Sequence, residues 1–398
     1  MKIVQVNAYY GNGSTGNIVK QILETSNKKN IDCYAVYWLG KNKDEYSKKI
    51  LYCGENKKRS IYIKFLHYCL LGGKIAYNKN RTKKIIETIK NINPDIIHLH
   101  NLHGDFEYGS IDLPYFFTEL SKMKKKVIWT FHDCWPITGR CYHFEYSRCN
   151  KWKTGCLNCP QRFYDRHGIF WDYAHKNWII KRELYQNIED LTIVTVSNWL
   201  KKIVENSMLK SRKIITIYNG VDTNIFKEKL LPKNKNIQIL GIGWDRKKGY
   251  KKYLEISKFL FQNEKLIVVG KQPIFRKFFK LPDNIITIDY IDDPLKLAKL
   301  YCQSDIYFNP SVAETFGLTT VESMACGTPV LGYARTATPE IIGECGIIYA
   351  KENFKKIMQE IREINTNKTI KEKCRQRVEE NFSLSKMLRN YLDLYLRN

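Results

Sequence analysis

The chain has 398 residues, of which 43% are hydrophobic and 13% aromatic, so it is not an intrinsically disordered protein. At this length two domains are expected, because single hydrophobic cores stop growing at about 250–300 residues. Lys and Arg exceed Asp and Glu by 66 to 40, a net charge of +26. Such an excess favours a polyanionic partner, namely nucleic acid, nucleotide phosphate or an anionic membrane surface. A lysine-rich solvated surface explains the same excess, so charge alone does not choose among these partners.

Nothing at the start of the chain resembles a secretory signal, because Met1 and Lys2 lead into a short strand-like run and then a polar loop. We therefore expect a cytoplasmic protein. The most apolar stretch, residues 61–77, is interrupted by Lys64, His67 and Lys74, so at most it lies on a membrane surface. Without an export signal, the 12 cysteines indicate reduced thiols or metal ligands rather than a disulfide framework.

Short β-branched runs alternate with longer amphipathic stretches along the whole chain. The first series of predicted strands comprises residues 2–6, 32–38, 95–99, 126–131 and 191–196. The second series comprises residues 213–218, 237–242, 266–269, 285–289, 306–309 and 329–333. Such alternation predicts an α/β protein with doubly wound parallel sheets, whose ligands bind at the carboxyl ends of strands.

We place the domain boundary after residue 209. The predicted parts are an N-terminal Rossmann-like domain (1–209) with a cysteine-rich insertion (134–165), a C-terminal Rossmann-like domain (210–383), and a helix (384–398) that packs back on the first domain.

A glycine-rich turn follows the first predicted strand and leads into a helical pattern. Gly11, Gly13 and Gly16 allow close approach of a ligand, and the following helix N-terminus offers N–H groups to phosphate. We predict that Gly16 gives a phosphate room, although glycine in such a turn also has purely steric reasons. The turn is not a dinucleotide fingerprint, because no acidic residue ends the second strand, and this disfavours a nicotinamide enzyme.

Two glutamates separated by seven residues follow a predicted strand in the second half of the chain. Glu314 precedes a helix that Gly317 opens, and Glu322 lies on it. This placement allows Glu314 to reach a sugar hydroxyl and Glu322 to accept hydrogen bonds from ribose. The N–H groups of Phe316, Gly317 and Leu318 would meet a phosphate. Spacing alone is equally compatible with a capping acid and a solvated glutamate.

Four cysteines, Cys141, Cys149, Cys156 and Cys159, lie in a polar, aromatic-rich segment after the fourth predicted strand of the first series. One Cys-x-x-Cys pair among four thiols suits a tetrahedral structural zinc ion. Unliganded thiols or a redox pair are the alternatives, because the spacing is not a standard two-knuckle pattern. Cys134 is a nearby fifth thiol rather than a predicted ligand.

The segment from Ser311 to Val330 resembles the E-x7-E motif of the retaining glycosyltransferases of family 4 (group 1), which have the GT-B fold. Residues 194–200 resemble the family's serine turn, and residues 217–222 resemble its interdomain hinge. The resemblance implies two Rossmann-like domains facing a cleft. It also implies transfer of a sugar from a nucleoside-diphosphate sugar with retained anomeric configuration, with no cofactor for catalysis.

Members of this family carry an Arg and a Lys before a glycine, and these cations neutralise the departing diphosphate. Lys248, before Gly249, matches the second of them, and Arg246 is the nearest guanidinium to the first, although the register differs from the family's. The segment from Thr130 to Cys141 resembles a polysaccharide-assembly subgroup with a His-Asp-Cys-Trp motif. In that subgroup the residue equivalent to His132 faces the donor sugar.

Three further histidines, His98, His100 and His103, follow a Pro-Asp pair, as in the same subgroup. They suggest a metal site, but His98 and His100 alternate along a strand, which favours packing or a role in lining the site. For Asp133, acceptor binding and a role as a turn acid are both open.

The subgroup resemblance implies assembly of a capsule, exopolysaccharide or O-antigen on a saccharide or lipid-pyrophosphate-linked acceptor. The basic runs 57–59 and 275–280 would suit peripheral attachment to an anionic membrane surface at the inner face. Two other functions stay open, a basic zinc-containing nucleic-acid-binding protein and a catalytically silent sugar-nucleotide sensor. The first leaves the glutamate motif without a role, so nucleic acid is not the expected partner.

Overall fold

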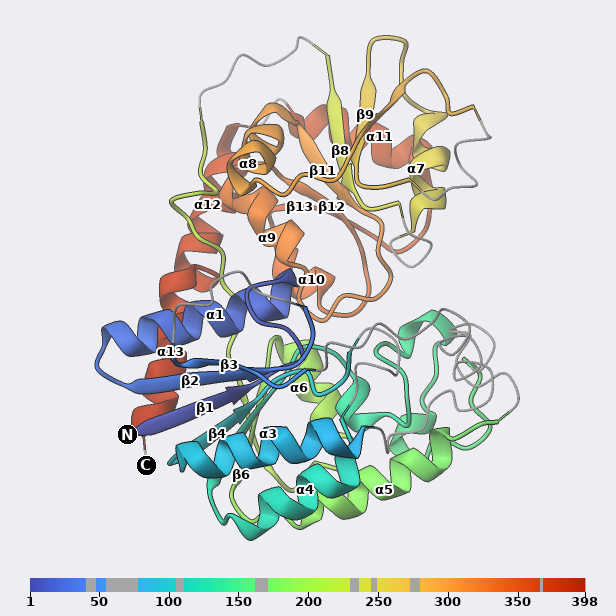
Figure 1. The fold of residues 1–398 in the computed structure, drawn as a ribbon. Coiled ribbons are helices and arrows are strands. Elements are labelled where there is room, and N and C mark those ends of the chain that lie inside the picture. Colours follow the sequence, from blue (N-terminus) through green and yellow to red (C-terminus); the bar gives the residue numbers. More distant parts are fainter. Residues whose placement is uncertain are drawn as a thin grey trace. The chain divides into compact units, whose positions relative to one another are not determined.

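The computed structural model describes residues 1–40, 48–54, 78–104, 111–161, 171–229, 236–244, 249–272, 280–365 and 368–397. The chain divides into two compact units (Figure 1). The first unit contains residues 1–217 together with 390–398, and the second contains residues 218–389.

The first unit is built on a seven-stranded parallel sheet with the order β3-β2-β1-β4-β5-β6-β7. Its strands are β1 (Lys2–Val6), β2 (Asp32–Tyr37), β3 (Ile50–Tyr52), β4 (Ile96–Leu99), β5 (Lys126–Phe131), β6 (Leu191–Thr195) and β7 (Lys213–Thr216). Its α-helices are α1 (Gly13–Lys28), α3 (Lys79–Ile92), α4 (Leu113–Lys122), α5 (Ala174–Gln186) and α6 (Asn198–Glu205).

Helices cover both faces of this sheet, with α3, α4 and α5 on one face and α1 on the other (Figure 1). All residues of β4 and β6 are buried, as expected for parallel strands covered on both sides. Between β5 and α5 the described chain has only three short 3-10 helices, η2 (Trp135–Ile137), η3 (Glu145–Ser147) and η4 (Lys151–Lys153).

The second unit is built on a six-stranded parallel sheet with the order β10-β9-β8-β11-β12-β13. Its strands are β8 (Gln238–Ile242), β9 (Lys265–Val269), β10 (Ile285–Ile288), β11 (Ile306–Asn309), β12 (Val330–Tyr333) and β13 (Gly346–Tyr349). Its helices are α7 (Tyr250–Ser257), α8 (Pro294–Gln303), α9 (Leu318–Ala325), α10 (Thr338–Ile342), α11 (Phe354–Asn365) and α12 (Lys368–Asn381).

Both sheets have a strand order that reverses after the first strand, which is the doubly wound arrangement expected from the alternating pattern. One predicted strand belongs to the other sheet. The run at 213–218 was expected to open the second series, but β7 pairs with β6 in the first sheet. An apolar run predicts a strand, whereas its partner depends on long-range packing.

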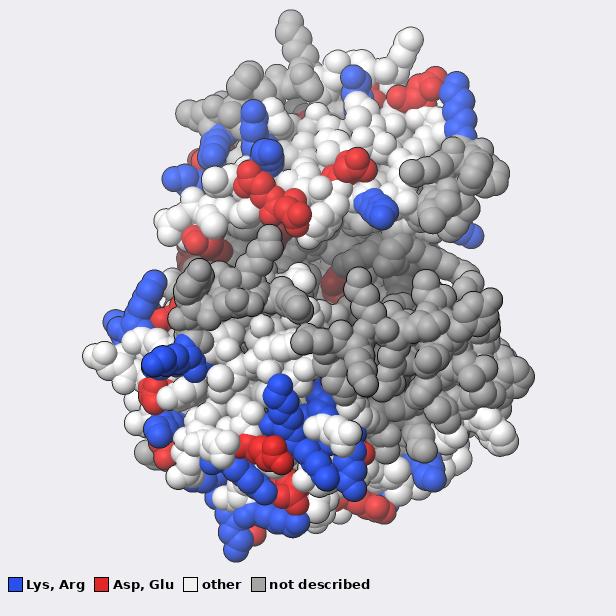
Figure 2. Space-filling model, in the orientation of Figure 1, with Lys and Arg blue, Asp and Glu red and all other residues white. Residues whose placement is uncertain are grey.

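The last helix, α13 (Leu384–Leu396), spans the division of the chain, with its residues from Asn390 onward in the first unit. There Tyr391 and Tyr395 are buried against the sheet. Among the described residues, none of the helices combines the length and the apolar character needed to cross a bilayer. Figure 2 shows Lys and Arg spread among Asp and Glu over the described residues of one face.

Candidate functional site

The loop between β11 and α9 in the second unit holds the main chain of Glu314 on both sides. Its N–H donates to Thr336 Oγ1 at 3.0 Å, and its carbonyl accepts from the N–H of Ala337 at 3.1 Å. At the start of this loop Asn309 Oδ1 accepts from the N–H of Ser311, and its Nδ2 donates to Thr320 Oγ1 on α9. These bonds tie the position of Glu314 to both the sheet and the helix.

Glu322 lies on α9, and its carboxylate accepts a hydrogen bond from the Tyr301 hydroxyl at 3.2 Å. Burial raises the pKa of Glu322 to about 7, while the bond from Tyr301 acts in the opposite direction. The carboxyl therefore takes up a proton close to neutral pH. A ligand that donates hydroxyl hydrogen bonds to this carboxyl would stabilise its charged form.

The helix that carries Glu322 begins after a glycine in the left-handed region. Gly317 has φ 92°, which a residue with a side chain rarely adopts, and it turns the chain into α9. Phe316 has its ring in the core, with centroid distances of 5.6 Å to Phe382 and 6.2 Å to Tyr218. Its side chain therefore does not face the helix start. The main-chain N–H groups of Phe316, Gly317 and Leu318 lie there, where N–H groups have no partners within the helix.

The predicted diphosphate cations, Arg246 and Lys248, lie outside the described residues. The next residue along the chain, Gly249, is described and has φ 77°. A Cβ atom there would lie 2.7 Å from the carbonyl oxygen of Pro310, closer than real Cβ contacts. The chain that follows Lys248 therefore passes directly against the start of the loop that carries Glu314.

In the first unit, polar side chains meet on the neighbouring strands β1, β4 and β5. Gln5 lies in β1, and His100 and His132 directly follow β4 and β5. His100 Nδ1 is 3.1 Å from His132 Nε2, and His100 Nε2 is 3.2 Å from Gln5 Oε1. The two imidazole rings are stacked with centroids 5.4 Å apart. His132 thus belongs to a hydrogen-bonded chain that runs into the sheet.

The inner end of this chain determines where the protons lie. Gln5 Nε2 donates to the carbonyl oxygen of Val19 at 3.1 Å, so its Oε1, which only accepts, faces His100. His100 therefore carries its proton on Nε2 and, being neutral, accepts at Nδ1 from His132. His132 in turn holds its proton on Nε2, which makes Nδ1 its basic nitrogen.

A second buried histidine on β4 bonds to the C-terminal helix. His98 Nδ1 is 2.6 Å from the Tyr395 hydroxyl, and His98 Nε2 is 2.8 Å from Thr130 Oγ1. Thr130 Oγ1 is also 3.2 Å from the Tyr391 hydroxyl. These bonds attach α13 to β4 and β5 within the first unit.

Burial keeps all three histidines neutral. It lowers the pKa of His98 to about 3 and that of His132 to about 4, and it holds the pKa of His100 well below 6.5. Neighbouring histidines lower these pKa values further, whereas Asp133 acts to raise the pKa of His132. At neutral pH this edge of the sheet therefore presents an uncharged imidazole.

Asp133 uses both carboxylate oxygens within the fold. Oδ1 accepts from the N–H of Trp135 at 2.8 Å, and Oδ2 lies 2.9 Å from His103 Nε2. Burial acts to raise the pKa of Asp133, but the charge and hydrogen bond of His103 and the Trp135 N–H outweigh it and lower the pKa. Of the two roles left open, the contacts match the turn acid.

Gly16 lies in the first turn of α1, and its carbonyl accepts from the N–H of Gly11 at 2.9 Å. A Cβ atom there would meet the main chain of Gly11 at 3.3 Å and of Tyr9 at 3.4 Å. Any side chain at this position would therefore crowd the compact turn. Its predicted role toward phosphate stays a prediction.

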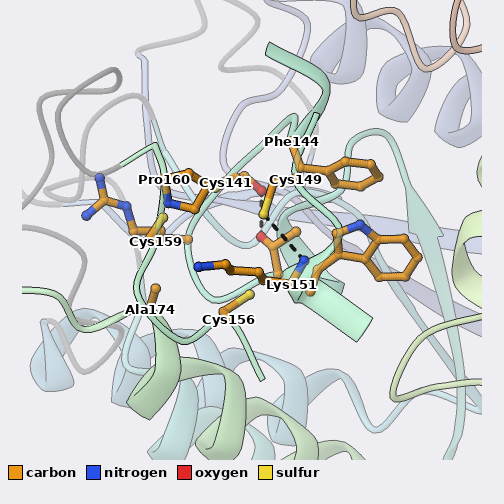
Figure 3. A pocket seen from close by; sticks show the side chains of 11 residues that line it. Cys141, Phe144, Cys149, Lys151, Cys156, Cys159, Pro160 and Ala174 are labelled. Atoms are coloured by element: carbon orange, nitrogen blue, oxygen red, sulfur yellow. Dashed lines mark hydrogen bonds between the residues drawn. The ribbon is translucent and has the colours of Figure 1, made fainter. Parts of the chain in front are cut away.

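Four predicted metal ligands, Cys141, Cys149, Cys156 and Cys159, line one small pocket in the segment between β5 and α5 (Figure 3). Within the described ranges, no three His, Cys, Asp or Glu side chains are spaced as the ligands of one metal ion. The same holds for the histidines that follow Pro94 and Asp95. His98 bonds to Thr130 in β5, and His100 bonds to His132 directly after β5.

Several polar residues that matter at these sites were not predicted. Gln5 is the one polar residue in the buried part of β1, and a polar residue within such an apolar run was an available signal. Lys181 is fully buried and donates to the carbonyl oxygens of Trp135 at 2.6 Å and Thr138 at 3.0 Å. Tyr301, Tyr391 and Tyr395 gave no signal, because each faces a partner remote in sequence.

Two doubly wound parallel sheets, one in each unit, are the architecture of the GT-B glycosyltransferases. The family "Glycosyl transferases group 1" matches residues 221–381, and "Glycosyltransferase Family 4" matches residues 53–225. The two matches together span residues 53–381, so the chain is a glycosyltransferase that combines these two family domains.

Two relatives that match over most of their length have names that refer to a cps region or to colanic acid biosynthesis. An uncharacterised 41.2 kDa protein in the cps region of Klebsiella pneumoniae is 27% identical, over 86% of this chain and 90% of that protein. The putative colanic acid biosynthesis glycosyl transferase WcaC of Escherichia coli K12 is 22% identical over 99% of both chains. The structure of HepE from Anabaena, in complex with UDP and glucose, superposes over 100% of both chains with a TM-score of 0.65 at 12% identity.

Proposed function

We propose that this glycosyltransferase moves a sugar from a nucleoside-diphosphate sugar to a saccharide acceptor, with retained anomeric configuration and without a catalytic metal ion. The observation that carries the proposal is the pair of glutamates at the β11–α9 loop, where Glu314 is clamped through its main chain and Glu322 is held by Tyr301. The HepE complex with UDP and glucose supports a nucleotide-sugar donor.

In this proposal Glu322 accepts hydrogen bonds from the ribose hydroxyls and Glu314 holds the donor sugar. The N–H groups at the start of α9 stabilise the diphosphate, because a helix N-terminus carries a partial positive charge. Arg246 and Lys248, whose family counterparts lie beside the diphosphate, supply full positive charges to the leaving group.

His132 is proposed to lie beside the reacting carbon. The acceptor hydroxyl forms a bond to the anomeric carbon while the bond from that carbon to the diphosphate oxygen breaks, and the leaving phosphate takes the hydroxyl proton. Positive charge develops on the sugar ring during this step. A neutral His132 is compatible with it, since an imidazolium there would oppose that charge.

The first test is thermal stabilisation of the purified protein by UDP, GDP, ADP and their common sugars. A ligand at about 1,000 times its dissociation constant should stabilise the folded state by about 4 kcal/mol. Glu322→Ala should abolish the response, whereas Glu344→Ala, which removes an exposed glutamate, should retain it. If no nucleotide or nucleotide sugar raises the melting temperature, the donor proposal is wrong.

A second test follows the product. Nuclear magnetic resonance of the new glycosidic bond should show the anomeric configuration of the donor, and added Mg²⁺ or Mn²⁺ should leave the initial rate unchanged. An inverted product would contradict the retaining mechanism, and a strict requirement for either ion would contradict metal independence. Tight binding of the donor with no transfer to any acceptor would favour the sugar-nucleotide sensor instead.

We further propose a role in cell-surface polysaccharide assembly at the cytoplasmic face of the membrane, with a lipid-pyrophosphate-linked acceptor. The names of the Klebsiella and Escherichia relatives and the net charge of +26 support it. The basic runs 57–59 and 275–279 lie outside the described residues. In vesicle flotation, the protein should float with anionic but not with neutral vesicles, and this difference should disappear at high salt. Equal behaviour with both lipids would exclude electrostatic membrane attachment.

A further inference from the structure

The segment between β5 and α5 has little regular secondary structure to stabilise it. Its described part, residues 134–161, contains only three short 3-10 helices. Four thiols line the pocket at its centre, those of Cys141, Cys149, Cys156 and Cys159 (Figure 3). The Cys141 and Cys159 side chains are in hydrogen-bonding contact. Residues 18 positions apart in sequence are thus brought together at their sulfur atoms.

Main-chain N–H groups point at these sulfur atoms. Cys149 Sγ accepts from the N–H of Lys151 at 3.4 Å, and Cys156 Sγ accepts from the N–H of Gly139 at 3.3 Å. Cys159 also receives a main-chain hydrogen bond, from Gln161. Such main-chain hydrogen bonds hold the sulfur atoms in place around the pocket, as outer hydrogen bonds do for the ligands of a metal ion.

The backbone at the third cysteine is strained. Cys156 has φ 55° and Asn158 has φ 49°, both in the left-handed region that residues with side chains seldom adopt. Such a conformation costs about 1–3 kcal/mol and persists where the surrounding structure imposes it. Here it directs Cys156 toward the pocket and shapes the Cys-x-x-Cys turn around Asn158.

Two buried basic side chains lie beside the thiols. Lys181 is fully buried and interacts electrostatically with Cys141 and Cys156. Arg140 is 8% exposed, lines the same pocket, and interacts with Cys159. A zinc ion with four thiolates carries a net charge of −2. Burial lowers the pKa of Lys181 to about 7, so of the two Arg140 is the fixed positive charge beside the thiols.

Helix α5 anchors the segment independently of the thiols. His175 Nδ1 lies 2.7 Å from the carbonyl oxygen of Gly155, and Trp178 Nε1 donates to the carbonyl oxygen of Trp152 at 2.8 Å. Asp172 Oδ2 accepts from the N–H of Cys159 at 2.9 Å. The main chain that carries the thiols is therefore held in place by bonds that do not involve the sulfur atoms.

We propose that Cys141, Cys149, Cys156 and Cys159 bind one structural zinc ion. The four thiols lose four protons to solvent and the four thiolates coordinate Zn²⁺ as a tetrahedron. In the described structure the sulfur atoms are not yet spaced as ligands, so binding draws them to about 2.3 Å from the ion. Cys134 is not a ligand, because it lies outside the pocket lining and is fully buried.

The zinc ion would be structural, since four protein ligands leave no open position for substrate. It would hold the segment that begins directly after His132 and Asp133. The inference does not rest on the proposed sugar transfer, because its primary readouts are metal content and coordination.

The test begins with the full-length protein purified without chelator. Elemental analysis should find one zinc ion per chain, and thiol modification should release it. Cys156→Ser and Cys159→Ser should each lose the zinc and lower the melting temperature. Cys302→Ser is the matched control and should retain one zinc, since Cys302 lies in the second unit, where a serine hydroxyl can still donate to the carbonyl of Lys227.

X-ray absorption at the zinc edge uses the unaltered protein and so does not depend on a variant that folds. It should show four sulfur neighbours at about 2.3 Å. Absence of stoichiometric zinc from protein expressed in zinc-replete medium would overturn the proposal. A Cys141–Cys159 disulfide in metal-free protein, or a spectrum dominated by nitrogen and oxygen, would overturn it as well.

Discussion

The two sheets carry buried titratable groups of opposite kinds at the positions proposed for function. In the first unit these groups are bases, the imidazoles of His98, His100 and His132, and burial keeps them unprotonated. In the second unit the group is an acid, Glu322, and burial favours its protonated form. The comparison teaches that burial favours the uncharged form of either type of residue. Only the second is then poised to gain charge when a ligand donates hydrogen bonds.

The largest expected effect of this difference is on the pH dependence of stability. Each of the three histidines has a folded-state pKa below 6.5, so the unfolded chain binds more protons between pH 6.5 and about 4. As the pH falls through this window, the free energy of unfolding of the first unit should decrease by about 1.4 kcal/mol per pH unit for each histidine.

Glu322 has a folded-state pKa above 4.5. As the pH falls from 7 to 4.5, the free energy of unfolding of the second unit should therefore increase by about 1.4 kcal/mol per pH unit.

Calorimetry of the intact protein at pH 7 and pH 5 measures both slopes. Seven of the eight tryptophans lie in the first unit and Trp244 lies in the second, so tryptophan fluorescence identifies the first unit's transition. If the melting temperatures of both units shifted in the same direction on acidification, the expected difference between the two units would be wrong.

The next effect concerns the polar chain on the first sheet. Gln5→Leu should cost about 1–3 kcal/mol of unfolding free energy, because it leaves His100 Nε2–H buried without its acceptor. The matched change in the second unit is Gln238→Leu, in the first strand of that sheet, where the amide makes only bonds of 3.3 and 3.5 Å. Urea unfolding should show less than about 1 kcal/mol for Gln238→Leu. Equal losses of unfolding free energy in the two variants would mean that the hydrogen bonds from Gln5 to His100 and His132 add no extra stability.

Removing a hydroxyl from α13 tests the attachment of this helix. Tyr395→Phe should cost about 1–2 kcal/mol, because His98 Nδ1 loses a bond of 2.6 Å inside the core. Tyr391→Phe should cost about half as much, because Thr130 keeps its bond to His98. Hydrogen exchange of the β4 and β5 amides should rank the two variants in the same order, and the reverse order would contradict the assigned contacts.

The smallest effect is expected in the second unit. Tyr301→Phe removes the bond that lowers the pKa of Glu322, so this pKa should rise further above its usual value. At pH 7 more of the carboxyl would then be protonated, and nucleotide-sugar binding should weaken by about 0.5–1.5 kcal/mol and recover at higher pH. Tyr307→Phe, which removes a bond to Thr319 instead, should leave the pH dependence of binding unchanged in titration calorimetry.

Much of the fold is readable from local sequence. Strands β1 and β5 run from Lys2 to Val6 and from Lys126 to Phe131, as predicted, because covered parallel strands appear as continuous apolar runs. Strand β3 was not predicted, since Ile50–Tyr52 is three residues long and only partly buried. Strand β13 (Gly346–Tyr349) was not predicted either, because it is short and begins with a glycine.

In the candidate site, too, the contiguous parts could be predicted from the sequence and the long-range contacts could not. The loop and helix that carry Glu314 and Glu322 are contiguous, so their spacing is visible in the sequence. Gln5 and His100 meet across neighbouring strands 95 positions apart, and this contact depends on the strand order of the sheet. Such pairings are set by tertiary packing, which a local pattern does not reveal.

The bond between His98 and Tyr395 joins residues 297 positions apart. At a synthesis rate of about 5–20 residues per second, His98 is made tens of seconds before its partner. The first unit therefore stays incomplete while the whole second sheet is synthesised, because His98 has no bond to α13 until that helix is made. The part of the protein that is made first is finished last, which gives the nascent chain a prolonged need for protection from aggregation.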